Sequence, residues 1–209
     1  ATTATATIRV QRDIEQQVGG RLTTIRDNLA RPNFELQVIK VHSEDEKMIW
    51  LAQNIHSFIG TGLIYTGTRI DTEIYSKWLQ FVGVDAIDYH AGFDALTRKS
   101  IEDGLMENRW KCVVSTNALG MGIDKSDIRF VIHTQLPASP IHYYQETGRA
   151  GRDGKPTRIL LFYNESKDNE MGVAADFRLP LAFIEGSRPP IGKYKKVIEL
   201  FQKEALLSE

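Results

Sequence analysis

The chain has 209 residues, a formal net charge of -1 and a hydrophobic content of 42%. This length allows one well-packed core with an appendage, and the charge excludes attraction of the whole chain to nucleic acid, so any such contact has to be local. The single cysteine, Cys112, excludes an intrachain disulfide, and no set of four zinc ligands is present. No signal peptide and no apolar run near 18 residues are found, so we expect a reducing compartment and no membrane partner.

The first part of the chain is predicted to form a helix, a strand and a second helix. Residues 8–18 have apolar side chains at helical spacing and are followed by a glycine pair, which ends the helix. Residues 34–41 alternate as a strand. Ser43 and Glu46 predict a capping box, in which the serine accepts from a free amide and the glutamate reaches back. The helix that they open is predicted to run to about residue 58.

From residue 63 onward, a pattern of strand, turn and helix repeats. Short apolar strands alternating with helices of ten or more residues predict an α/β fold with a parallel sheet and right-handed crossovers. The predicted strands are residues 63–65, 85–89, 111–115, 130–133 and 159–163. Two helices are predicted at 71–81 and 94–108. A third helix is predicted to begin at Pro140, with Ser139 as its N-cap.

Polar or glycine-rich segments follow four of these strands directly. They are residues 66–69, 90–92, 116–124 and 134–137. In an open parallel sheet, ligands bind beyond the carboxyl ends of the strands. We therefore expect these four loops to meet along one edge and to form a binding surface there.

Two arginines stand in a glycine-rich stretch near the end of the pattern. Residues 145–154 read Gln-Glu-Thr-Gly-Arg-Ala-Gly-Arg-Asp-Gly. Two glycines cost about 2 kcal/mol of helix propensity relative to alanine, but they let the backbone bend close to a ligand. The guanidinium group is always charged and forms bidentate bonds to phosphate. The stretch favours phosphate recognition, and a solvated basic loop is the alternative.

Residues 113–125 read Val-Val-Ser-Thr-Asn-Ala-Leu-Gly-Met-Gly-Ile-Asp-Lys, and with 145–154 they resemble motifs V and VI of superfamily 2 helicases. The amino-acid sequences of both segments are similar to those of the RecQ family of DNA helicases. Residues 3–6 look like motif III, and 62–69 resemble motif IV. The resemblance implies a RecA-like parallel sheet flanked by helices, the second motor domain of a helicase, with a small helical C-terminal extension.

The resemblance covers roughly residues 1–168 and implies three parts. Residues 1–32 would hold the motif III joint and the tail of the first motor domain, and 33–168 the second RecA-like domain. Residues 169–209 would form a linker and the start of an accessory helical domain, with an amphipathic helix at 194–207. The phosphate loop and the acidic Mg²⁺ motif of a first motor domain do not occur in this sequence. One cysteine also excludes the four-cysteine zinc module that usually follows in the family.

By resemblance, Arg152 would be the arginine finger that reaches ATP, and Arg149 would be its partner. ATP and Mg²⁺ would be held mainly by the upstream domain. Gln145 would orient the attacking water or sense the state of the nucleotide. Asp124 would contact the ribose or position the arginine finger. Gly122 would also belong to the ATP-binding residues, in addition to its role in a tight turn.

A second set of residues would contact DNA phosphates without reading the bases. It comprises Thr116, Ser115, Asn117, Arg69, Thr66, His90 and Gly92. A structural role for His90 is an equal alternative. Packing is the favoured interpretation of the other prominent aromatic side chains, which are Tyr143, Tyr144, Trp50, Trp78 and Trp110.

The function that the resemblance implies is that of the second motor domain of an ATP-dependent DNA helicase, with 3′-to-5′ polarity expected. The partners would be single-stranded or unwinding duplex DNA and the upstream RecA-like domain of the same polypeptide. The setting would be DNA repair and recombination, in the cytoplasm with the nucleoid or in the nucleus. The alternatives are an RNA helicase of the same superfamily and a non-catalytic DNA-binding module that kept the fold.

Overall fold

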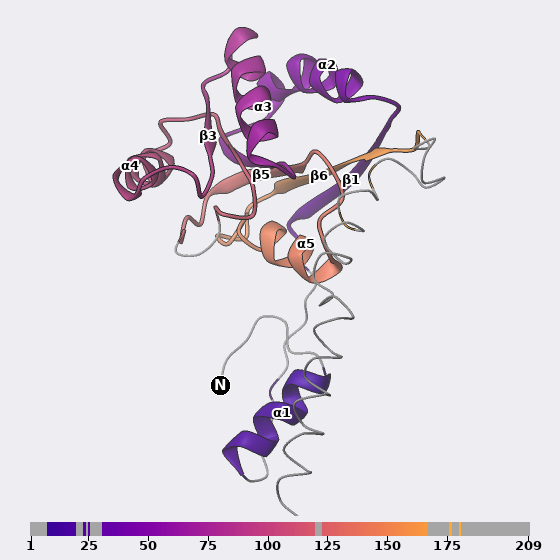
Figure 1. Cartoon of the computed structure of the whole chain (residues 1–209), viewed down its shortest axis with the longest axis vertical. Coiled ribbons are helices and arrows are strands. Elements are labelled where there is room, and N and C mark those ends of the chain that lie inside the picture. Colours follow the sequence, from indigo (N-terminus) through magenta and orange to yellow (C-terminus); the bar gives the residue numbers. More distant parts are fainter. Residues whose placement is uncertain are drawn as a thin grey trace, which may run out of the picture.

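The computed structural model describes residues 8–19, 23, 25, 31–119, 123–166, 176 and 180. Its centre is a six-stranded sheet in the order β1-β6-β5-β2-β4-β3, and every neighbouring pair is parallel (Figure 1). This arrangement confirms the predicted α/β class. The strands are β1 (Phe34–Val41), β2 (Thr61–Tyr65), β3 (Ala86–Tyr89), β4 (Cys112–Ser115), β5 (Ile128–His133) and β6 (Thr157–Asn164). The helices are α1 (Ile8–Val18), α2 (Glu44–Asn54), α3 (Arg69–Phe81), α4 (Ala95–Met106) and α5 (Pro140–Thr147).

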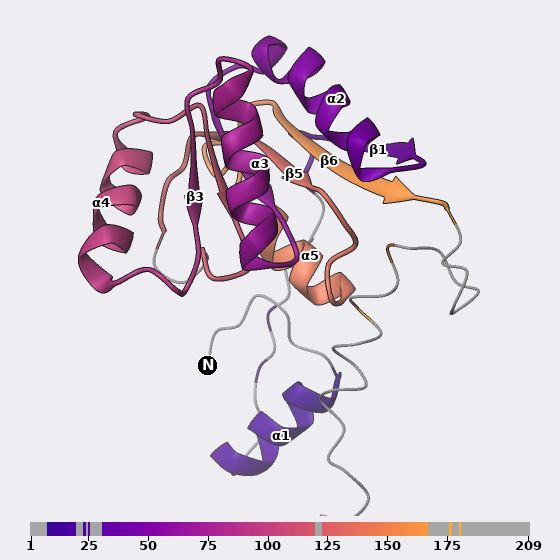
Figure 2. The ribbon, with the colours of Figure 1, turned by 45° about the horizontal axis from the view of Figure 1, so that its top comes forward.

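Helices cover both faces of the sheet, which is why the inner strands are apolar at successive positions (Figure 2). In β2, Ile64 belongs to the hydrophobic cluster under α2 and α3, whereas its neighbours Leu63 and Tyr65 belong to the cluster under α4 and α5. The alternation repeats in β4, where Val114 and Val113 face opposite clusters. Burial on both sides fixes the register of these strands, because a slip by one residue would exchange the two faces.

The start of β2 differs from the predicted element bounds. The strand begins at Thr61, two residues before the predicted start, and includes Gly62. A methyl group on Gly62 would lie 2.2 Å from the ring of Phe130, so the glycine serves close strand packing at this position. The helix before it is also shorter than predicted, because α2 ends at Asn54 and a 3-10 turn, Ile55–Ser57, follows.

The predicted cap of α2 is present with one change. The Ser43 hydroxyl accepts from the Glu46 amide at 3.1 Å, as expected. The Glu46 carboxylate accepts from the amide of His42 at 2.7 Å, one residue earlier than a capping box requires. A complete capping box occurs instead at α3, between Thr68 and Asp71, where the sequence analysis did not predict one.

The half-buried tryptophan side chains serve packing, as predicted, and the cysteine is buried. Trp50 meets Phe162 edge to face at 5.3 Å, and the Trp78 indole donates to the Met48 carbonyl oxygen at 2.8 Å. Trp110 packs against the cluster on the other face. Cys112 is fully buried, and this burial raises the pKa of its thiol to about 12.

Two predicted segments lie outside the described residues: the motif III segment at 3–6 and the amphipathic helix at 194–207. The helix predicted at 8–18 is present as α1, and none of its residues is buried. The sheet spans residues 34–164 and so falls within the predicted domain 33–168, while the division of the chain into three parts stays a prediction.

Candidate functional site

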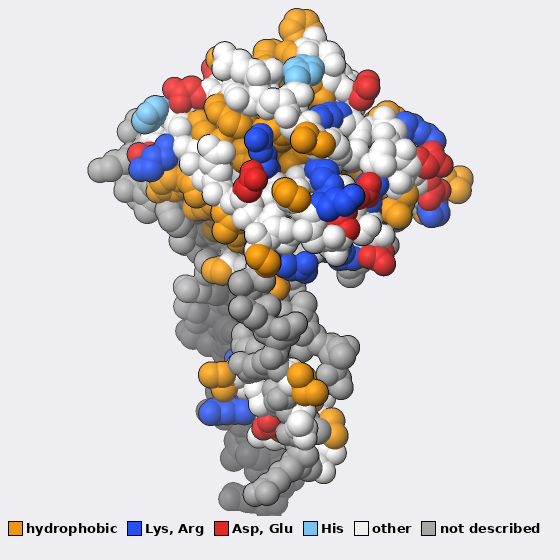
Figure 3. All heavy atoms as spheres, turned by 180° about the vertical axis from the view of Figure 1, so that it is seen from behind, with side chains coloured by type: hydrophobic (Ala, Val, Ile, Leu, Met, Phe, Trp, Pro, Cys, Tyr) orange, Lys and Arg blue, Asp and Glu red, His pale blue; other side chains and the backbone are white. Residues whose placement is uncertain are grey.

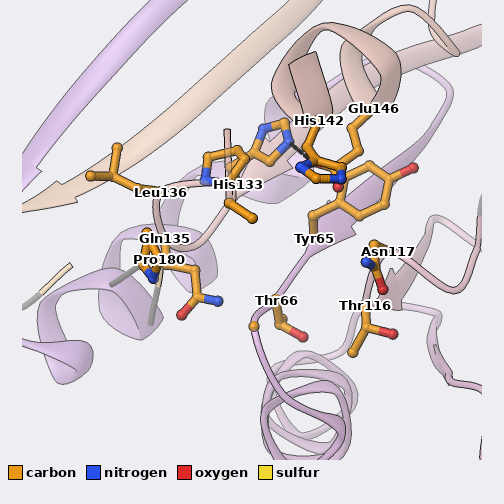
Figure 4. A pocket seen from close by; sticks show the side chains of 13 residues that line it. Tyr65, Thr66, Thr116, Asn117, His133, Gln135, Leu136, His142, Glu146 and Pro180 are labelled. Atoms are coloured by element: carbon orange, nitrogen blue, oxygen red, sulfur yellow. Dashed lines mark hydrogen bonds and ion pairs between the residues drawn. The ribbon is translucent and has the colours of Figure 1, made fainter. Parts of the chain in front are cut away.

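A pocket lies at the carboxyl edge of the sheet, where β2, β4 and β5 end (Figure 4). Three of the four predicted loops contribute to its wall, so the predicted convergence of loops at this edge is confirmed for them. The side of α5 closes the pocket. The lining residues are Tyr65, Thr66, Gly67, Thr116, Asn117, His133, Gln135, Leu136, Pro137, Ala138, His142, Glu146 and Pro180.

The polar residues of the β2 and β4 loops meet in this pocket. The Thr66 amide donates to the Ser115 carbonyl oxygen at 2.9 Å, which ties the two loops together. Thr66, Thr116 and Asn117 line the wall. Ser115 is 0% exposed, and its hydroxyl donates to the Thr116 carbonyl oxygen at 2.7 Å. The expected phosphate contact of the Ser115 side chain is therefore corrected: Ser115 lies beneath the surface and supports Thr116.

Arg69, His90 and Gly92 form a second polar group, beyond β3. The Gly92 amide donates to His90 Nδ1 at 3.1 Å, and a methyl group on Gly92 would lie 3.2 Å from Arg69 Nη1. The three residues predicted for the DNA surface are thus brought together. The His90 imidazole is buried and stacks on Phe93 at 4.0 Å between ring centroids. This packing favours the structural alternative for the His90 side chain, which shapes the loop.

The two motif arginines follow directly after α5. The Ser139 hydroxyl accepts from the His142 amide at 3.2 Å and Pro140 begins the helix, as predicted. The helix ends at Thr147, so Gln145 lies on its last turn and Arg149 and Arg152 lie in the turn beyond. The arginines therefore stand on a short, irregular segment rather than on a helix. This segment leads back to the amino ends of β5 and β6, where the Gly151 amide donates to the Ile128 carbonyl oxygen at 3.0 Å.

Arg152 is paired with Asp124, another residue of the predicted nucleotide set. Arg152 Nη1 lies 2.6 Å from Asp124 Oδ1. The Arg152 side chain is 35% exposed and that of Asp124 is 90% exposed, so the pair stands at the surface. The carboxylate directs the guanidinium while leaving other N–H donors of the fork available. Gly122 lies outside the described residues.

Arg149 is placed more deeply than Arg152. Its Nε atom is buried and has no hydrogen-bond partner among the residues that the structure describes. Burial raises the pKa of the Tyr65 hydroxyl, and the positive charge of Arg149 acts in the opposite direction. A buried donor without an acceptor costs about 1–3 kcal/mol. Such a group is typical of a site that a ligand or partner completes.

Three residues of this site were missed by the sequence analysis: Tyr65, His133 and Glu146. His133 Nε2 lies 2.8 Å from Glu146 Oε2, and the Tyr65 ring stacks on the His133 imidazole at 5.3 Å (Figure 4). Tyr65 and His133 are the last residues of neighbouring strands and are paired in register. The signal that was available is their shared position at the strand ends, directly before predicted site loops.

Other kinds of site find little support in the described part of the chain. There, no group of three or more His, Cys, Asp and Glu side chains is arranged to hold a metal ion. Within the same residues, no helix combines the length and hydrophobicity that a bilayer span needs. On the face seen in Figure 3, basic side chains lie among acidic and hydrophobic ones, so that face presents no field of a single charge.

The chain is similar to known proteins in family, sequence and fold. The helicase conserved C-terminal domain family matches residues 46–154. The ATP-dependent DNA helicase RecQ of Haemophilus influenzae is 38% identical over 166 residues, covering 78% of this chain and 26% of the relative. The protein of the same name from Bacillus subtilis is 36% identical over 165 residues, covering 78% of this chain and 28% of the relative. The chain thus spans about a quarter of the length of these relatives.

Among solved structures, Saccharomyces cerevisiae Dbp5 bound to RNA and ADP BeF3 superimposes with a TM-score of 0.69 at 20% identity. The match covers 96% of this chain and 53% of that one. At this level of identity the likeness establishes the shared fold alone.

Proposed function

This chain belongs to the helicase C-terminal domain family, with RecQ-type DNA helicases among its relatives, and from this we propose that it is the second motor domain of an ATP-dependent DNA helicase. The observation that carries the proposal is the arrangement of the two arginines. Arg152 is held at the surface by Asp124, and the buried Nε of Arg149 has no acceptor within the described part of the chain. Both lie on the segment between α5 and β6.

Arginines in this arrangement suit the transfer of a phosphoryl group. Negative charge accumulates on the phosphoryl oxygens in the transition state, and an arginine finger raises the rate by about 10³–10⁵. In the proposal, Arg152 is that finger and Asp124 positions it. Arg149 supplies a second cation close to the sheet, and Gln145 on α5 orients the attacking water or senses the nucleotide.

The nucleotide itself would be held mainly by an upstream RecA-like domain, which would supply the phosphate loop and the carboxylates for Mg²⁺. The fit of the present residues to ATP rests on Arg149 Nε, which lacks an acceptor among the residues described, and on the partly exposed fork of Arg152. Because this sequence contains no phosphate loop, the 209-residue chain alone is expected not to hydrolyse ATP.

The polar pocket wall is proposed to form part of the track for single-stranded DNA. Thr66, Thr116 and Asn117 offer neutral donors at the pocket, and Arg69 adds a cation beside Gly92. Hydroxyl, amide and guanidinium donors bind phosphates without reading bases, as a motor that moves along any sequence requires. Unwinding with 3′-to-5′ polarity remains part of this proposal.

The decisive experiment replaces Arg152 in the full-length protein that carries both motor domains. Arg152→Ala is expected to lower the DNA-stimulated rate of ATP hydrolysis by about 10³-fold or more, while single-strand affinity stays within a few-fold. Arg152→Lys should recover little activity, because an ammonium group cannot form the bidentate fork. Arg158→Ala, at a half-exposed arginine on β6, is the matched control and should leave the rate unchanged. Near-normal turnover in Arg152→Ala would exclude the proposed finger.

The same assay distinguishes the alternatives. Stimulation of the parent protein by RNA rather than by single-stranded DNA would indicate an RNA helicase. Binding of DNA by the parent without any ATP hydrolysis would indicate a non-catalytic module.

A further inference from the structure

The backbone on either side of Arg152 is bonded to the part of the chain that leads into β5. Before the arginine, the Gly151 amide donates to the Ile128 carbonyl oxygen at 3.0 Å. After it, the Asp153 amide donates to the Ser126 carbonyl oxygen at 3.3 Å. The segment that carries the proposed arginine finger therefore follows the start of β5, and the side-chain contacts decide how firmly it is held there.

Two side-chain ion pairs join the same two stretches of chain. One is the surface pair of Arg152 with Asp124, already described. In the other, Arg129 Nη2 donates to Asp153 Oδ2, and the two side chains are only 13% and 22% exposed. Solvent and salt screen such a pair less than a surface pair. The hydrogen bond from Arg129 lowers the pKa of Asp153, so the carboxylate stays charged at neutral pH. The better protected of the two ion pairs is therefore the one that Arg129 makes.

Arg129 is itself held in place by its surroundings. It is the second residue of β5, and its stem lies against the turn before β2, where a methyl group on Gly60 would be 2.5 Å from Arg129 Cγ. The stretch before β5 is fixed by Lys125, which is buried, lies 2.6 Å from Asp127 and donates to the Met106 carbonyl oxygen at 3.3 Å. The guanidinium of Arg129 therefore stands on a rigid base.

We propose that Arg129 is a positioning residue for Arg152, and that its ion pair with Asp153 holds the finger segment against the start of β5 so that Arg152 reaches the nucleotide. This inference rests on the proposed function. Arg129 acts through the residue that directly follows the finger in the sequence and does not touch the nucleotide itself. Asp124 then directs the Arg152 side chain, whereas Arg129 fixes the backbone from which that side chain extends.

The test uses Arg129→Gln in the full-length protein, which removes the charge and keeps most of the stem. Displacement of a catalytic group by about 1 Å can cost about 10²-fold in rate, so kcat for DNA-stimulated ATP hydrolysis should fall by about 10- to 100-fold. KM for ATP and the affinity for single-stranded DNA should change less than twofold, because the upstream domain holds the nucleotide and the proposed DNA track lies at the carboxyl edge of the sheet. An equal loss of kcat and of DNA affinity would indicate general damage and would overturn the inference.

A conservative variant and a matched control sharpen this test. Arg129→Lys keeps a positive charge beside Asp153 and should retain most of kcat, whereas Arg152→Lys should recover little. The control is Arg109→Gln, because Arg109 lines the same pocket as Arg129 and also forms an ion pair, with Glu107 at 2.8 Å. This control should leave kcat unchanged. Arg129→Lys with as large a loss as Arg129→Gln would contradict the role of the charge pair.

A double-mutant cycle shows whether Arg129 acts through Asp153. If the two side chains work as one pair, Arg129→Gln and Asp153→Asn together should lower kcat no further than either change alone. Two independent, multiplying losses would overturn the inference. Unchanged kcat in Arg129→Gln, beside a strong loss in Arg152→Ala, would overturn it while leaving the proposed function intact. Near-normal kcat in Arg152→Ala would instead contradict the proposed function itself.

Discussion

Replacing Gly151 by alanine is expected to destabilise the fold by about 3 kcal/mol. Gly151 has a φ of +56°, a conformation that costs an L-residue about 1–2 kcal/mol. A methyl group there would also lie 2.4 Å from Thr157 Oγ1 and 2.5 Å from Asn33 Nδ2. The Asn33 amide donates to the carbonyl oxygens of Gly151 and Lys155 at 2.9 and 3.0 Å, and moving it would weaken bonds worth about 1 kcal/mol each.

The matched control for this substitution is Gly154→Ala, three residues along the same turn. Gly154 has a φ of +75°, but a methyl group there would meet nothing within 4 Å. It should therefore cost only the conformational term, about 1 kcal/mol. Urea unfolding followed by circular dichroism, with equal m-values, gives both changes in the free energy of unfolding. Equal losses in the two variants would refute the crowding at Gly151 as the cause.

Three further predictions concern DNA binding, thiol reactivity and pH. Arg69→Ala and Thr116→Ala in the full-length protein should each weaken single-stranded DNA binding by about 1 kcal/mol, with little dependence on base sequence. Titrations with DNA of mixed sequence at two salt concentrations measure this change. Unchanged affinity in both variants would exclude the proposed DNA track. Cys112 should not react with a disulfide reagent at pH 8 in the native chain but should react fully in guanidinium, because burial raises its pKa to about 12; fast native reaction would refute this burial. The hydrogen bond from Arg129 lowers the pKa of Asp153, so this carboxylate stabilises the fold above its unfolded pKa of about 3.9 and loses that effect as the pH falls through the folded value. Asp153→Asn should therefore lower stability at pH 7 and differ less from the native chain near pH 3 in acid titrations of the unfolding midpoint.

The order of helices and strands could be read from the sequence because its signals are local. Alternation of apolar runs with helical spacing predicted the parallel sheet, and Ser139 with Pro140 predicted the start of α5. The predicted strand starts after Gly62, because the ring that requires a glycine there belongs to Phe130, far along the chain. The residues next to Gly62 in the sequence give no indication of such a long-range contact.

The site shows the same division between local and distant causes. The motif arginines and the loops of the pocket were found from their own residues, and the sheet brings Arg152 to Asp124. The resemblance to motif V predicts a surface position for Ser115, whereas the pleat of β4 directs its side chain inward. Lys47 resembles a solvated helix lysine, yet it is buried and lies 3.3 Å from the Asp176 carboxylate. Only the folded chain reveals a partner so distant in sequence.

The pairing of β1 with β6 has a consequence for how the chain is made. β1 lies at the edge of the sheet, and its sheet neighbour is the last strand, with Phe34 opposite Thr157 (Figure 1). During translation, β1 leaves the ribosome long before β6, and the edge that later pairs with β6 is then unpaired. Contacts that close so late form slowly and expose the chain to aggregation in the meantime. A nascent chain that stops before Thr157 should therefore require a chaperone, and release of β6 should complete the sheet.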